Sequence, residues 1–195
     1  MMSIHAEKGM QCVDCHYAQD GHGNGFIHGE VASAVEISCK DCHGTAKKLP
    51  SLYTSGPASR PGGMDMTGLR NPDGKRRFEW VKKDGLDVLL QRSVLDPELV
   101  WEVSLTKDSV TAGHPKYNEK SAWAKTVAKN NKDWGADAQS ADLAHDDEEM
   151  ECFTCHLSWT TSCGGCHLPI EANWKKKSHK YDGGVTRNYA TYNPQ

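Results

Sequence analysis

The sequence has no long apolar run and few large hydrophobic residues. No stretch approaches the ~18 consecutive apolar residues of a membrane-spanning helix, so we predict no transmembrane segment. Only 37% of the 195 residues are hydrophobic, and three are phenylalanine. A chain of this length forms one or two domains, but this composition gives it a poor hydrophobic core. We therefore expect bound groups other than side chains to fill part of the interior.

No cysteine lies outside four short segments of one pattern. These segments are CVDCH from residue 12, CKDCH from 39, CFTCH from 152 and CGGCH from 163. Each contains two cysteines separated by two residues and followed at once by histidine, which is the attachment sequence of c-type haem. Only ten of the 195 residues are histidine, so four such coincidences are improbable.

The chemistry of attachment explains the spacing. Two thiols about one helical turn apart can add to the two vinyl groups of one haem, and the next histidine then reaches the iron. We therefore predict four haem c groups. The attaching residues are Cys12, Cys15, Cys39, Cys42, Cys152, Cys155, Cys163 and Cys166, and the proximal ligands are His16, His43, His156 and His167.

Two other uses of paired cysteines compete with haem attachment. A zinc ribbon also uses two C-x-x-C pairs, and the spacing between Cys15 and Cys39 would suit one, but it has no need of a histidine after each pair. Disulfides are common in exported chains, but four C-x-x-C pairs suit redox proteins better than disulfide scaffolds. Haem attachment remains the leading interpretation.

The motifs divide the chain into segments. We predict an N-terminal dihaem segment over 1–49, a loop and small β-rich insertion over 50–110, and a C-terminal helical dihaem segment over 111–195. IHAEKGMQCVDCH at 4–16 aligns without gaps on AHDDEEMECFTCH at 144–156, with five identical positions, which suggests either a duplication or a shared local geometry.

The insertion has the alternation of β-strands. Turn residues separate β-branched and aromatic runs between about 75 and 106, which predicts a small antiparallel meander. Residues 118–131 have helical spacing and predict a surface helix packed through Trp123 and Val127. The fold class we expect is mostly irregular, with short α-helices wrapped around covalently bound haems and the β meander inserted in the middle.

Histidines outside the motifs are candidates for the second axial position of each iron. We predict that His5, His22, His114 and His145 serve in this way, with His28 and His179 as the alternatives. His5 and His145 each lie eleven residues before a proximal histidine. On one continuous helix that spacing is ~16 Å, too far to close the same haem, so each should ligate a neighbouring haem.

The sequence resembles the multihaem c-type cytochromes. The resemblance is carried by the four C-x-x-C-H segments, by the histidine seven residues before two of them, and by HGNG at 22–25. It implies bis-histidine haems of low potential that transfer electrons in an exported respiratory chain. Two alternatives stay open, which are a multihaem reductase of a small oxyanion or nitrogen compound with one open haem, and a subunit of an extracellular cytochrome filament.

The net charge and the expected location limit the classes of partner that the chain could bind. The formal net charge is −3, and ferric haems with ionised propionates would make it roughly −7, which argues against nucleic acid. Covalent haem attachment occurs outside the bacterial cytoplasm, yet the first residues, MMSIHAEKGM, contain no hydrophobic signal segment. We expect a processed chain or a fragment of a longer protein, in the periplasm or outside the cell. Its partners would be redox proteins or an extracellular electron acceptor, further haem domains or identical subunits.

Overall fold

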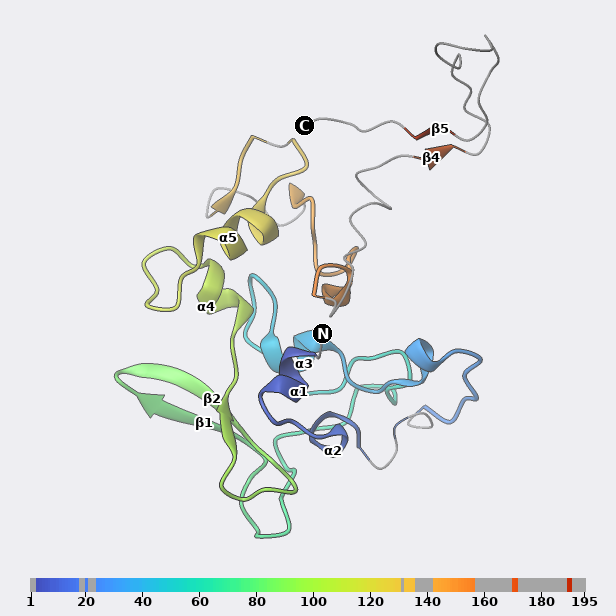
Figure 1. The fold of residues 1–195 in the computed structure, drawn as a ribbon, viewed down its shortest axis with the longest axis vertical. Helices are drawn as coiled ribbons and strands as arrows, with labels where there is room; N and C mark the ends of the chain where they lie inside the picture. The colour runs from blue at the N-terminus through green and yellow to red at the C-terminus, as the bar shows by residue number, and fades with distance from the viewer. Residues whose placement is uncertain are drawn as a thin grey trace, which may run out of the picture. The chain divides into compact units, whose positions relative to one another are not determined.

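The computed structural model describes residues 3–17, 20, 24–130, 132–135, 142–156, 170–171 and 189–190. The chain divides into two compact units, Ile4–Met150 and the combination of Met1–Ser3 with Glu151–Gln195. The elements of the first unit are α1 (Ile4–Glu7), α2 (Cys12–Cys15), η1 (Val31–Ala34), α3 (Cys39–His43), β1 (Phe78–Lys83), β2 (Leu86–Arg92), β3 (Val100–Glu102), α4 (Thr106–Val110) and α5 (Glu119–Thr126) (Figure 1). Those of the second are η4 (Cys152–Thr154), β4 (Ile170–Glu171) and β5 (Tyr189–Ala190), the last two paired antiparallel.

The larger unit is built on a three-stranded antiparallel sheet in the order β1-β2-β3, inside the range 75–106. Asp84 and Gly85 connect β1 to β2, and both have positive φ, 52° and 81°. Tight hairpins need this backbone conformation, which asparagine, aspartate and glycine adopt most readily. The Asp-Gly turn therefore sets the register, in which Lys83 lies opposite Leu86.

A small hydrophobic core lies against this sheet. Its buried members are Leu52, Met66, Phe78, Leu89, Val103 and Leu105. Tyr17 and Cys42, from the segments of the first two motifs, pack against the same cluster and are partly buried. The core of the β-rich insertion therefore continues directly into the predicted haem-attachment segments.

A buried carboxylate at the third residue of each of the first two motif helices joins it to the insertion. The Asp14 carboxylate accepts hydrogen bonds from the backbone N–H groups of Gln11 (2.8 Å) and Val94 (2.8 Å). Asp41 accepts from Ser38 N–H (2.7 Å) and Ser55 N–H (2.8 Å). Acidic residues in a first helical turn satisfy N–H groups that have no partner within the helix. Contacts between protein groups therefore fix the start of each motif helix.

Two helical predictions need correction. The surface helix covers Glu119–Thr126 rather than 118–131, and its buried positions are Ala122 and Thr126. Trp123 is 53% exposed and meets Trp134 edge to face, with 5.3 Å between ring centroids. The helix is short and its buried side is narrow, so the large indole lies outside the packed face.

The histidine-to-motif segments are not continuous helices either. α1 ends at Glu7, Gly9 has φ of +85°, and α2 begins only at Cys12. In the second copy, residues 144–150 form turns instead of a helix. The three-turn spacing predicted for His5 and His145 is therefore wrong as a description of the backbone.

No helix in the parts of the chain that the structure describes is both long enough and apolar enough to cross a membrane.

Candidate functional site

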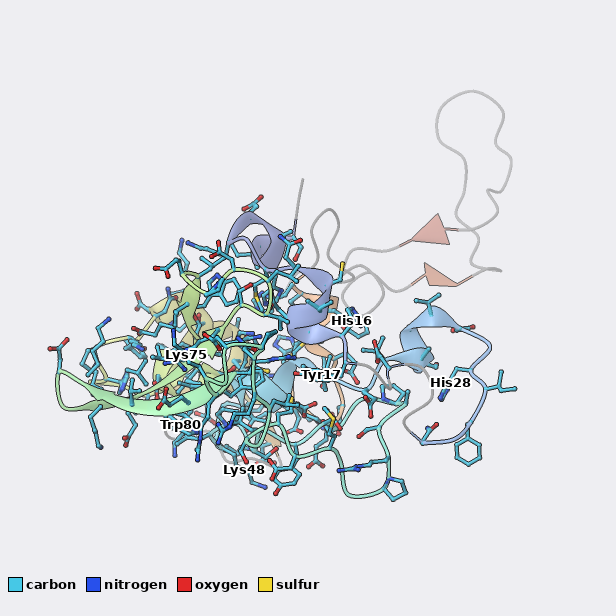
Figure 2. The ribbon with its side chains drawn as sticks, turned by 90° about the horizontal axis from the view of Figure 1, so that it is seen from below. His16, Tyr17, His28, Lys48, Lys75 and Trp80 are labelled. Atoms are coloured by element: carbon cyan, nitrogen blue, oxygen red, sulfur yellow. The ribbon has the colours of Figure 1, made fainter. Side chains whose placement is uncertain are left out.

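The first two motifs meet around Tyr17. α1, α2 and α3 lie beside one another in Figure 1, and Tyr17 directly follows the first motif (Figure 2). Burial, followed by the nearby Cys15 thiol, raises the pKa of Cys42 to about 12. Burial and then Cys42 and Cys15 also raise the pKa of Tyr17 well above its usual range. One thiol of each motif is thus close enough to influence the other and the phenol between them.

Contacts on both sides fix the Tyr17 ring. Its hydroxyl donates to the Met66 sulfur at 3.0 Å, and the Arg77 guanidinium lies 5.8 Å above the ring centroid. A tyrosine in the core usually needs a partner for its O–H, and an arginine over its face adds a cation–π contact. The junction of the two motifs is therefore an ordered part of the core.

A histidine from outside the motifs approaches the histidine of the second motif. The ring centroids of His5, on α1, and His43, at the end of α3, are 5.9 Å apart and the rings are tilted by 40°. Desolvation and then His43 lower the pKa of His5, which favours the neutral imidazole that metals bind. The two imidazoles belong to different motif segments, because His5 precedes the first motif and His43 closes the second.

This separation fits an iron held between two imidazoles. Metal–nitrogen bonds of about 2 Å put two opposed nitrogens about 4 Å apart, and the ring centroids roughly 6 Å apart. Rings in ordinary tilted contact also lie about 4.5–7 Å apart. The separation of His5 and His43 is therefore compatible with the two axial ligands of one haem as well as with a direct ring contact.

Hydrogen bonds at Nδ1 orient three of the predicted ligands. His43 Nδ1–H donates to the Ser104 carbonyl at 2.7 Å, and His145 Nδ1–H donates to the Ala124 carbonyl at 2.6 Å. His16 Nδ1 bonds to the carboxylate of Asp20. Metal-ligating histidines usually donate their second ring N–H in this way, which fixes the tautomer and leaves Nε2 for the metal.

His114 and His28 have environments of a different kind. The backbone N–H of Lys116 donates to Nδ1 of His114 at 3.2 Å, which puts the ring proton on Nε2, 3.8 Å from Asp108. Nε2 of His28 bonds to the Asn24 side-chain oxygen at 3.2 Å, and His28 lies well away from Tyr17 (Figure 2). Neither environment favours iron ligation through Nε2, so the predicted role of His114 gains no support.

The remaining predicted residues lie in the smaller unit or outside the described residues. Cys152, in η4, and Cys155 and His156 follow one another in a short turn, where the backbone N–H of His156 donates to the Cys152 carbonyl at 3.0 Å. The predicted ligands and attachment residues that fall outside the described ranges are His22, Cys163, Cys166, His167 and His179.

The competing interpretations of the cysteines gain no support from the larger unit. Cys12, Cys15 and Cys42 form no disulfide. A zinc ribbon would gather four ligands in one place, but within the described ranges no three His, Cys, Asp or Glu side chains are grouped to hold a metal ion. Haem needs only the two thiols of its motif and axial ligands from opposite sides.

A buried carboxyl group three residues before the second motif was not predicted from the sequence. Glu36 is 1% exposed, and its Oε2 has no hydrogen-bond partner among the described residues. Its backbone N–H donates to Oδ1 of Asp20 at 2.7 Å. Burial and then Asp20 raise the pKa of Glu36, and Arg60 opposes them in part. The folded protein therefore holds the Glu36 proton more tightly than the unfolded chain does.

This difference predicts a pH dependence of stability. The pKa of Glu36 is higher in the folded protein than in the unfolded chain. Its contribution to folding stability is therefore fully present below the ordinary glutamate pKa, and it is lost as pH rises through the pKa of the folded state. The free energy of unfolding of the haem-loaded protein, measured by urea titration from about pH 4 to about pH 8, should fall across that window. Glu36→Gln should flatten this part of the profile. A profile unchanged from wild type in Glu36→Gln, or flattened equally by the exposed control Glu98→Gln, would contradict the assignment.

The start of the chain is similar to a known family of proteins. Residues 1–44 match the family model described as cytochrome c554 and c-prime. The match spans the first two motifs and supports a c-type cytochrome with covalently bound haem and a role in electron transfer. No curated protein matches the chain. No solved structure matches it either.

Proposed function

We propose that this chain is an exported electron carrier holding four haem c groups, one at each C-x-x-C-H motif. The observation that carries the proposal is the His5–His43 pair, whose 5.9 Å centroid separation suits two axial ligands of one iron. The family match over residues 1–44 supports haem-based electron transfer independently. Each haem, once bound, supplies an iron that changes by one electron between ferric and ferrous.

The chain contributes attachment, orientation and spacing. The paired thiols fix each ring, and the Ser104 and Ala124 carbonyls set the tautomers of His43 and His145. Imidazole on both faces lacks the thioether that raises the potential in Met/His cytochromes, so we propose low potentials. His5 ligating the haem of the second motif would link two attachment segments through one iron, even though the connecting backbone is not a continuous helix.

The intact mass of the protein should show four attached haems. The mass should exceed that of the 21.5 kDa polypeptide by four haem groups. Changing Cys12 and Cys15 together to serine removes both thioether bonds of the first motif and should lower the count by one. A three-haem mass for the wild-type chain would contradict the proposal and would point to CGGCH, the motif with two glycines, as unused.

A further inference from the structure

The histidines of the site differ in what their Nδ1 atoms bond to. His43 and His145 each donate to a backbone carbonyl, at 2.7 Å and 2.6 Å. His16 bonds instead to the side-chain carboxylate of Asp20, four residues further along the chain. A carbonyl is a neutral acceptor and a carboxylate an anionic one, so the first motif has the strongest acceptor of the three.

Other contacts hold this carboxylate in position. Its second oxygen, Oδ1, accepts the backbone N–H of Glu36 at 2.7 Å, and the backbone N–H of Asp20 donates to the Tyr17 carbonyl at 2.9 Å. The Asp20 side chain is 18% exposed, whereas that of His16 is 51% exposed. The acceptor is therefore more enclosed than the imidazole that it orients.

Resting on the function proposed above, we infer that Asp20 is a positioning residue that lowers the reduction potential of the first haem below that of the second. An imidazole that donates to a carboxylate becomes a more basic ligand, which stabilises ferric over ferrous iron. The Ser104 carbonyl raises the basicity of His43 less, because it carries no net charge. One side chain would thus separate the potentials of two haems whose motifs meet at Tyr17.

The test is Asp20→Asn in the full-length, haem-loaded protein. The amide keeps the size of the side chain but offers a neutral acceptor like that of His43. At a fixed electrode potential we expect about a tenfold fall in the ferric-to-ferrous ratio of one haem, equivalent to about 59 mV upward for one electron. The ferric EPR signal of the same haem should also shift. A His16→Met variant identifies that signal as the first haem.

Three further variants make the result decisive. Asp20→Ser removes the same charge and should give the same upward shift, so the test remains available if one variant folds poorly. Asp20→Glu keeps a carboxylate and should restore most of the low potential. Asp87→Asn removes one charge from an exposed position on β2, where the side chain is 61% exposed. This change should leave the reduction potential of every haem unchanged.

The outcomes separate this inference from the proposed function. Unchanged potentials in Asp20→Asn and Asp20→Ser, with four haems still present by mass, would overturn the role of Asp20 alone. An equal shift in Asp87→Asn would also overturn it, because general charge would then explain the effect. A wild-type chain without haem at the first motif would overturn the proposed function itself.

Discussion

Replacing His5 by alanine should turn one ferric haem from low spin to high spin and leave the others low spin. The reason is the distance between His5 and His43, which suits two ligands of one iron. His43 would stay in place because the Ser104 carbonyl holds its Nδ1–H independently of His5. Absorption and EPR spectra of the oxidised protein measure the change, and a companion change at His43 identifies the haem of the second motif.

His28 offers a matched control for this variant. Its Nε2 bonds to Asn24, and the side chain lies apart from the junction of the first two motifs (Figure 2). His28→Ala should leave the spin state of every haem unchanged. A fully low-spin His5→Ala protein with all haems attached would show that His5 is not an axial ligand. High spin at the first haem instead of the second would show that His5 closes the haem of its own motif.

The cysteines and histidines of the motifs are predicted from the sequence alone, because covalent haem attachment would fix their spacing. The sequence did not identify which histidine His5 approaches. A continuous helix was the wrong premise, since Gly9 takes positive φ between α1 and α2, yet His5 still approaches the proximal histidine of the other motif. The approach depends on how α1 packs beside α3, and such packing has no signature in the spacing of one segment.

Some supporting residues had a sequence signature and others had none. The first two motifs both read C-x-D-C-H, and the aspartates, Asp14 and Asp41, prove to be buried. The third and fourth motifs have threonine and glycine at that position, so the sequence itself distinguishes them from the first two motifs. The Ser104 and Ala124 acceptors are backbone carbonyls, which any residue could supply, and only the fold assigns them to His43 and His145.

Replacing Asp41 by alanine should be among the most destabilising changes in the larger unit. Its carboxylate accepts from Ser38 N–H and Ser55 N–H and also from the Ser55 hydroxyl, and the residue is 2% exposed. Alanine would remove the acceptor of three part-buried hydrogen bonds, at up to about 1–3 kcal/mol for each donor that water does not reach and less than additively. We therefore expect the free energy of unfolding of the haem-loaded protein to fall by about 3 kcal/mol.

Asp41→Asn separates lost hydrogen bonds from lost charge. Its amide oxygen can accept both backbone N–H groups and its amide nitrogen can donate to the Ser55 hydroxyl, so the local structure can survive. Burial raises the pKa of Asp41, which means that the charged form is costly in the folded state, and asparagine removes that cost. In urea titrations Asp41→Asn should therefore stay within about 1 kcal/mol of wild type. Asp87→Ala, at an exposed strand position, should have little effect. Equal losses in Asp41→Ala and Asp41→Asn would instead make the negative charge, rather than the acceptor geometry, the source of stability at the second motif.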